Sequence, residues 1–274
     1  MSEEFSDWIG KSEQASDRIE AGRCNALIAA LGAPLVLKDG DAMPLLHHWL
    51  HFWNVQPPEG LGPDGHPAKG GFLPPVPLPR RMWAGGRLKF EQPLHIGETV
   101  EKTSTILGVK AKEGKSGRLV FVTVEHRLAG EGGLAIVEEQ DLVYREAATA
   151  PIPGPSGEDT VPDCTWHRTI HPDEVLLFRY SALTMNGHRI HYDLPYAKGE
   201  EAYPALVVHG PLQATCLAAM AQRELGGSLR TFDFRGMSPA FAGTTLHVCG
   251  EKTEEGAKVW TVQAGATCMS ATAT

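Results

Sequence analysis

The sequence predicts an α+β protein in which an antiparallel sheet wraps around a buried helix, and it predicts this arrangement twice. Residues 99–109, 118–127 and 134–145 alternate apolar and polar side chains and are separated by glycine-rich turns at 114–117 and 130–133, a pattern typical of an antiparallel meander. The segment 210–225 is apolar nearly all round, which is typical of a helix that is buried on most sides. Long strands twist enough to wrap such a helix.

The order of helix followed by meander occurs on both sides of a stretch rich in Ala, Pro, Gly and Thr. A chain of 274 residues is long enough for two medium domains, each with its own core. We therefore expect an N-terminal unit at 1–148, a linker at 149–163 and a C-terminal unit at 164–274.

In the first unit, helical periodicity predicts helices over 17–31 and 43–53, and Asp17 with Glu20 has the pattern of an N-terminal cap. The segment 57–79 then carries so many Pro and Gly residues that regular structure is excluded. It is expected to be a long functional loop or a mobile lid.

In the second unit, the pattern predicts a strand at 166–170, a helix at 172–184 and, after an irregular polar segment, a helix at 210–225. Four strands are expected to follow, at 229–235, 244–251, 259–264 and 267–274.

Composition excludes several classes of protein. The net charge is −8 and no Lys/Arg block occurs, so nucleic acid is not an expected partner. Apolar runs fall far short of the roughly 20 residues that span a bilayer, and the acidic N-terminus has no leader pattern. We expect a cytoplasmic protein. Its five cysteines are scattered without Cys-x-x-Cys spacing, which favours structural, reduced thiols.

The polar loop, defined here as residues 185–193, is the most informative segment. It places Asn186, His188, Arg189 and His191 after a short helix, shortly before His209-Gly210-Pro211 opens the apolar helix. Polar groups in a buried loop are costly unless they are paired. We therefore expect this loop to bind a ligand.

The chain resembles the MaoC-like, hotdog-fold hydratases and dehydratases of acyl thioesters. Within them it is most similar to the hydroxyacyl-thioester dehydratase type 2 group and the related mesaconyl-C4-CoA and itaconyl-CoA hydratases. The residues that carry the resemblance are 78–86 (LPRRMWAGG), 178–184 (FRYSALT), Asn186, 191–193 (HYD) and 209–211 (HGP). It implies a double hotdog: two fused units, each an antiparallel sheet wrapped around a central helix, with the active site at the seam.

The resemblance also implies catalytic residues. The usual hydratase motif is Asp, any residue, Asn-Pro, any residue, His; here His191 matches the His, and Asn186 occupies the Asp position. Because an amide cannot take a proton, we expect His191 to carry the proton and the Asn186 carbonyl oxygen to hold the water. Gly210, at the helix N-terminus, is the expected oxyanion contact.

Substrate contacts are expected from several other residues. Arg80 and Arg81 suit a distal carboxylate or the CoA phosphates, with surface salt bridges as the alternative reading, and Arg189 and Arg235 are further anion candidates. Tyr192 belongs to the same motif. His188 and His209 are expected either to take part or to pack behind the site.

His47 and His48, beside Trp49, are interpreted as stacked or surface residues. No metal site is predicted, since nothing like His-Glu-x-x-His occurs. No cofactor is expected either, because CoA is part of the substrate.

The leading hypothesis is a hydro-lyase that hydrates a short, branched dicarboxylic enoyl-CoA, mesaconyl-C4-CoA or itaconyl-CoA, to citramalyl-CoA. The first alternative is dehydration of 3-hydroxyacyl carrier-protein or CoA thioesters in fatty-acid synthesis. A second is a non-catalytic acyl-thioester-binding protein, which Asn186 favours and His191 disfavours, and a third is thioester hydrolysis. Whether two chains form a homodimer is left open.

Overall fold

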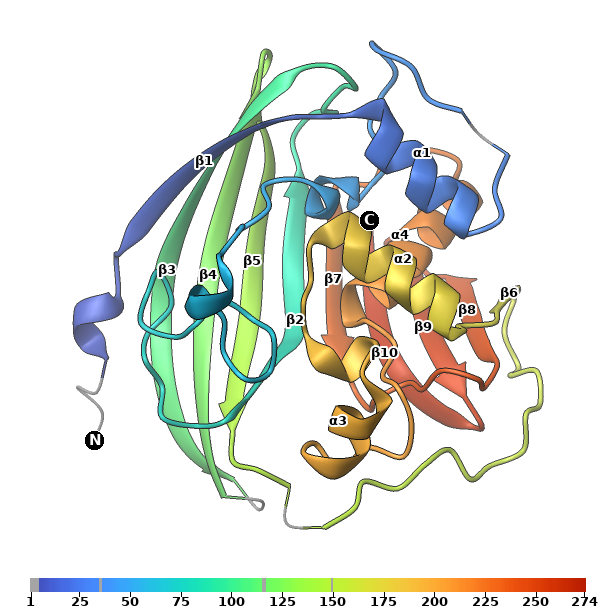
Figure 1. Cartoon of the computed structure of the whole chain (residues 1–274). Coiled ribbons are helices and arrows are strands. Elements are labelled where there is room, and N and C mark those ends of the chain that lie inside the picture. The colour runs from blue at the N-terminus through green and yellow to red at the C-terminus, as the bar shows by residue number, and fades with distance from the viewer. Residues whose placement is uncertain (1–4, 35, 115–116, 149) are drawn as a thin grey trace.

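A computed structural model describes residues 5–34, 36–114, 117–148 and 150–274. Its centre is one ten-stranded antiparallel sheet with the strand order β1-β3-β4-β5-β2-β7-β10-β9-β8-β6 (Figure 1). The strands are β1 (Ser12–Arg18), β2 (Arg80–Phe90), β3 (Thr99–Gly114), β4 (Gly117–Gly130), β5 (Gly133–Arg145), β6 (Trp166–Ile170), β7 (Thr231–Gly236), β8 (Leu246–Lys252), β9 (Ala257–Gln263) and β10 (Ala266–Ala273).

The two expected meanders are confirmed as the two halves of this sheet. β3, β4 and β5 follow one another as antiparallel neighbours, and β8, β9 and β10 do the same in the C-terminal half. The halves join where β2 pairs with β7, from Gly85 opposite Arg235 to Lys89 opposite Thr231. The chain therefore has the α+β architecture of a double hotdog.

The C-terminal strands wrap a buried helix, as expected. Helix α4 (Gly210–Leu225) packs against β7, β8, β9 and β10, and the side chains of Leu212, Leu217 and Ala218 are almost fully buried. It ends at Gly226, whose left-handed backbone (φ 72°) is a common helix stop.

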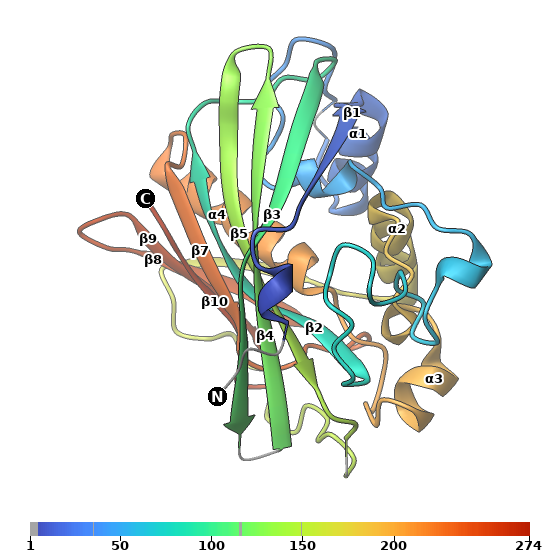
Figure 2. The ribbon, with the colours of Figure 1, turned by 90° about the vertical axis from the view of Figure 1, so that its left-hand side faces the viewer.

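The N-terminal half uses its helix differently. Helix α1 (Ala21–Ala30) packs against α2 (Glu174–Thr184) and the short helix η2 (His47–Leu50). It lies near one end of the long strands β3–β5 rather than along them (Figure 1). Figure 2 shows α1, α2 and α3 on the same side of these strands as the loop that precedes β2. In the N-terminal half, loops rather than a central helix therefore cover much of this side of the strands (Figure 2).

Two predicted helices need correction. Asp17 and Arg18 belong to β1, which pairs with β3, and α1 starts only at Ala21. The Asp17 carboxylate does not cap the helix; it accepts hydrogen bonds from the Phe52 N–H and from Arg23. The open edge of β3 supplies backbone partners for β1, and no local pattern reveals such a partner.

The helix predicted over 43–53 is reduced to the 3₁₀ turn η2. Leu46, the residue before it, has a left-handed backbone (φ 66°), which interrupts any longer helix. The short helix α3 (Leu194–Gly199) was not predicted, although Asp193 caps it through the Tyr196 N–H and Pro195 stands in its first turn. Both are ordinary helix-start signals.

The remaining predicted elements are confirmed within a few residues. Three short 3₁₀ helices complete the list: η1 (Ser6–Trp8), η3 (Pro58–Gly60) and η4 (Arg189–His191). The segment 150–165 has no helix or strand, and the unit boundaries proposed around it stay a prediction. Residues 1–4 of the acidic N-terminus, 115–116 of the first hairpin turn and 149 of the expected linker lie outside the described residues. None of the described helices is long and apolar enough to cross a membrane.

Candidate active site

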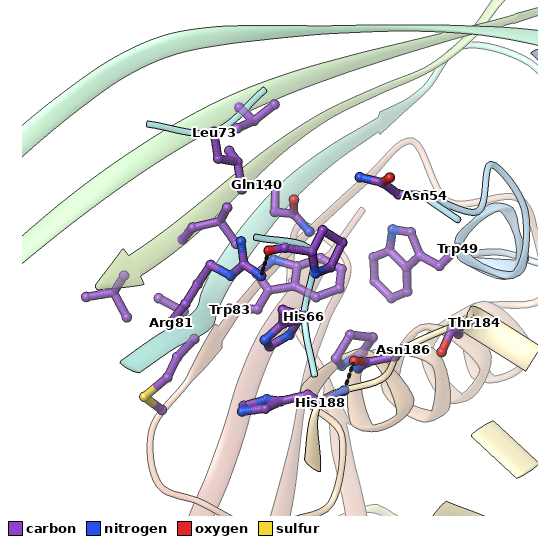
Figure 3. Close-up of a pocket in the computed structure, with 18 of the residues that line it drawn as sticks. Trp49, Asn54, His66, Leu73, Arg81, Trp83, Gln140, Thr184, Asn186 and His188 are labelled. Atoms are coloured by element: carbon purple, nitrogen blue, oxygen red, sulfur yellow. Dashed lines mark hydrogen bonds between the residues drawn. The ribbon is translucent and has the colours of Figure 1, made fainter. Parts of the chain in front are cut away.

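A cavity of about 1250 Å³ lies between the N-terminal strands and the polar loop. Its walls come from β2–β5, from the segments 48–54 and 66–73, from the polar loop and from the first turn of α4. Figure 3 shows side chains from these separate segments converging on it. Both Asn186 and His191 line the cavity, together with Gly210.

His191 is held in one tautomer. Its Nδ1–H donates to the Val207 carbonyl oxygen at 2.7 Å, so Nε2 carries the free lone pair. Burial lowers the pKa of this imidazole to about 4, although the bond to Val207 acts in the opposite direction. His191 is therefore neutral near pH 7 and able to accept a proton.

His209 lies behind His191 and out of the cavity. The two rings stack with centroids 3.6 Å apart and planes at 18°, and His209 Nε2 hydrogen-bonds Ser181 Oγ at 2.8 Å. His209 is fully buried, its Nδ1 has no partner among the described residues, and burial holds its pKa well below 6.5. It packs against the His191 ring and does not line the cavity.

Gly210 is the first residue of α4, so its N–H has no acceptor within the helix. The next residue, Pro211, has no N–H at all. His209 immediately precedes this amide and stacks on His191. The helix N-terminus and the imidazole are therefore neighbours on the cavity wall.

Asn186 follows α2 after Met185, which has a left-handed backbone (φ 51°). Its side-chain oxygen accepts a hydrogen bond from the His188 N–H at 3.0 Å (Figure 3). One lone pair of that oxygen is thus committed to the loop. The second lone pair and the amide N–H groups are left for a ligand.

His188 occupies the centre of a row of imidazoles. Its ring centroid lies 4.2 Å from that of His66 and 5.5 Å from that of His191. His66 comes from the Pro/Gly-rich segment, residues 57–79, and was not predicted as a site residue. The only local signal for it was a polar Asp-Gly-His triplet inside a run of Gly and Pro.

Asp64, His66 and His188 offer ligand atoms that all lie within 4.8 Å of one another. Such a set can hold a divalent metal. His66 already hydrogen-bonds Asp64 through Nδ1 at 2.9 Å. The guanidinium of Arg81 acts electrostatically on both residues, and this positive charge opposes a cation.

Of the predicted arginines, Arg81 alone lines the cavity. It follows Arg80 on β2, and successive side chains on a strand point to opposite faces. The buried Arg80 ion-pairs with Glu201 instead. Arg80 is therefore not available as an anion-binding residue and forms a salt bridge, although a buried one, whereas Arg81 stays a candidate.

Three other predicted substrate contacts, Arg189, Arg235 and Tyr192, lie outside the cavity walls. Arg189 pairs with Asp193 at 2.7 Å, and Arg235 is exposed on β7. Tyr192 is 49% exposed and donates its hydroxyl to the Gly187 carbonyl. These side chains hold the polar loop or face solvent.

A second polar group in the cavity was also missed. His48 is buried rather than on the surface, and its Nε2–H donates to Glu138 Oε2 at 2.9 Å. Trp49 Nε1–H donates to the same carboxylate at 3.1 Å. Burial raises the Glu138 pKa, but these two donors outweigh it and hold that pKa below its usual value. His47 is buried as well.

Residues 46–242 match the family model of hydroxyacyl-thioester dehydratase type 2. The chain belongs to this family. It is 45% identical over 236 residues to mesaconyl-C4-CoA hydratase of Chloroflexus aurantiacus, which covers 85% of this chain and 84% of the relative. It is 30% identical to the mitochondrial hydroxyacyl-thioester dehydratase type 2 of Schizosaccharomyces pombe, over 76% and 77% of the two chains.

Solved structures agree on the fold. A MaoC-like dehydratase superimposes with a TM-score of 0.72 over 98% of this chain and 99% of its own, at 13% identity. HtdX of Mycobacterium tuberculosis superimposes with a TM-score of 0.67 over 95% and 99% of the two chains, at 14% identity. The family and its named members make this chain a hydro-lyase of the enoyl-thioester hydratase and dehydratase type.

Proposed function

We propose that the protein hydrates a short enoyl-CoA whose acyl group carries a distal carboxylate, with mesaconyl-C4-CoA as the leading substrate and citramalyl-CoA as the product. Itaconyl-CoA is the second substrate of the same kind. The observation that carries this proposal is the neutral His191 beside the free amide of Gly210 on the wall of one cavity. The likeness to a mesaconyl-C4-CoA hydratase supports the choice of acyl group.

The proposed reaction starts with a water molecule positioned by Asn186. His191 Nε2 removes a proton from this water as its oxygen bonds to the β-carbon. The electrons of the double bond move into the thioester and form an enolate oxygen. The Gly210 N–H and the positive end of α4 stabilise that oxygen, and protonation of the α-carbon completes the hydration.

Arg81 is the proposed partner of the distal carboxylate, since a guanidinium binds a carboxylate bidentately. The rest of the cavity wall is mixed, with apolar side chains such as Phe121 and Leu128 of β4 beside polar ones. Arg81 on β2 pairs with Tyr144 on β5. Glu138 lies six residues from Tyr144 along β5, a distance of about 20 Å. This far part of the wall carries Gln140 and Glu138.

Dehydration of a 3-hydroxyacyl thioester with a longer chain is a second candidate. The cavity volume of about 1250 Å³ favours it, because sites for small ligands usually measure about 300–1,000 Å³.

The test is the absorbance of the conjugated thioester after the protein is mixed with mesaconyl-C4-CoA, itaconyl-CoA or crotonyl-CoA. We expect the fastest loss of absorbance with a dicarboxylic substrate, and a loss of activity of about 10²–10⁴-fold in His191→Gln. No turnover of any of the three substrates would refute enoyl-CoA hydration and favour a non-catalytic binder. Release of free CoA from a saturated acyl-CoA would indicate a thioesterase.

The role of Arg81 has its own test. Arg81→Gln should raise the KM for mesaconyl-C4-CoA about 10-fold or more, which is the cost of a lost charge-assisted hydrogen bond, and leave crotonyl-CoA nearly unchanged. Arg235→Gln, on the solvent face of β7, is the matched control. Equal effects of Arg81→Gln on both substrates would contradict selective recognition.

A further inference from the structure

The Pro/Gly-rich segment contributes a hydrogen-bonded carboxylate and imidazole to the cavity. The His66 Nδ1–H donates to Asp64 Oδ2 at 2.9 Å, and the His66 backbone N–H donates to Asp64 Oδ1 at 3.0 Å. This double contact fixes the ring and its tautomer. His66 Nε2 is therefore the nitrogen that is left for a ligand.

The segment is docked directly on the polar loop by backbone contacts. The Asp64 carbonyl accepts a hydrogen bond from the Arg189 N–H at 2.9 Å, and the Pro63 carbonyl accepts one from Arg189 Nη1 at 3.1 Å. A Cβ added to Gly65 would lie 2.0 Å from the Gly187 carbonyl oxygen. Only two facing glycines allow the chains to approach this closely, so the approach holds His66 against His188 (Figure 3).

The proposed reaction needs a proton donor to the α-carbon, and Asn186 cannot be that donor because an amide side chain does not titrate. The described cavity walls also carry His48, His51 and His126, but the imidazoles that adjoin His191 in one row are those of His188 and His66. His188 has no carboxylate hydrogen-bonded to it among the described residues, whereas His66 has Asp64. A carboxylate partner stabilises an imidazolium ion.

We propose that His66, oriented by Asp64, is the second proton-transfer group of the active site and does the work of the carboxylate that Asn186 replaces. This inference rests on the proposed hydration. His191 takes a proton from water as the C–O bond forms. This proton passes to Nε2 of His66, which gives it to the α-carbon as the enolate returns to a thioester. Both imidazoles end neutral, so the balance is one water added to one double bond.

Burial and the positive charge of Arg81 lower the pKa of His66, although Asp64 acts in the opposite direction, so His66 is neutral at rest and becomes protonated only as it relays the proton. The same surroundings disfavour a metal at these residues. His188, Arg81 and Asp64 face the imidazole, and the positive charge of Arg81 acts on both His66 and Asp64. A bound divalent cation would have to displace the bond between His66 and Asp64 or bind beside a guanidinium.

The experiment compares His66→Gln with His66→Gln/Asn186→Asp, assayed with mesaconyl-C4-CoA. His66→Gln should lower kcat about 100-fold and change KM by no more than a few fold. The Asn186→Asp substitution would keep an acceptor for the His188 N–H and restore a carboxylate, so the double variant should recover at least about 10-fold of the lost kcat.

His95→Gln is the control, because His95 is exposed and does not line the cavity. Thermal melting of each variant separates loss of folding from loss of chemistry. A kcat of His66→Gln within three-fold of wild type, or a loss confined to KM, would overturn the proposal. Activity that EDTA abolishes and zinc restores would overturn it too, by making Asp64, His66 and His188 a metal site.

Failure of this inference is distinct from failure of the proposed function. If wild type hydrates mesaconyl-C4-CoA and His191→Gln does not, the function stands whatever His66→Gln does. If wild type hydrates none of the three enoyl-CoA substrates, both the proposed function and the inference about His66 are refuted.

Discussion

Replacing Gly65 by alanine should damage hydration far more than it damages stability. Gly65 has a φ of +85°, and an added Cβ would lie 2.0 Å from the Gly187 carbonyl oxygen. Ordinary contact with a Cβ begins near 3.4 Å, so the two loops must separate by about 1.4 Å, the difference between these distances. A misplacement of about 1 Å at an active site can cost about 100-fold in rate.

Gly10→Ala is the matched control for this prediction. Gly10 has the same φ of +85°, but its added Cβ would meet nothing within 4 Å. Both variants should therefore lose about 1–2 kcal/mol of stability, because alanine is strained in a left-handed backbone. For domains of about 150–250 residues, each kcal/mol lowers Tm by about 2–4 °C. Only Gly65→Ala also moves the segment that carries His66.

The assay is kcat with mesaconyl-C4-CoA alongside a thermal melt of both variants. We expect Gly10→Ala to hydrate at the wild-type rate and Gly65→Ala to lose about 100-fold. A rate for Gly65→Ala within a few fold of that for Gly10→Ala would refute the reasoning, since it would show that the contact between the two loops does not position the reacting groups.

Three further predictions concern the cavity walls. Glu138→Gln removes the buried ionic partner of His48 and should lower the free energy of unfolding at pH 7 by about 3–5 kcal/mol. Because the folded pKa of Glu138 is depressed, this loss should shrink as the pH falls below about 4.5. Urea unfolding at pH 7 and at pH 4 measures both effects. The folded pKa of His191 is lowered to about 4 from 6.5, so the unfolded state binds a proton at a higher pH than the folded state does. Neutral His191 therefore contributes about 3 kcal/mol to the free energy of unfolding, a contribution that is complete above pH 6.5 and is lost as the pH falls toward 4. A Tm that rises on acidification over this range would contradict this. Asn186→Ala should lower kcat about 10-fold or more, because the amide holds the loop and is the group proposed to position the water; a rate within a few fold of wild type would exclude that proposed role.

Local patterns were enough for much of the fold. The alternation in β3, β4 and β5 predicted the meander because each strand buries one face. The apolar surface of 210–225 predicted the buried helix α4 because such a surface must be covered on nearly all sides. His191 was predicted from the resemblance to the MaoC-like motif and Gly210 from its place at a helix N-terminus, and both line the cavity.

Only the tertiary structure decided that the Pro/Gly-rich segment lies against the polar loop. Asp64 and His66 come from a segment without periodicity, and their contacts with His188 and Arg189 span more than a hundred residues of chain. The same is true of the bond between His48 and Glu138, which joins residues 90 positions apart. Such contacts depend on the free energy of the whole packed chain, and no local propensity encodes them.

What the sequence determined alone is which segments bury one face, because burial leaves a period in the residues themselves. What the fold decided is which polar side chains share the cavity. Arg80 and Arg81 are adjacent in sequence, yet one is buried against Glu201 and the other lines the cavity. The pleat of β2 separates them, and only the packing around that strand settles which face meets the ligand.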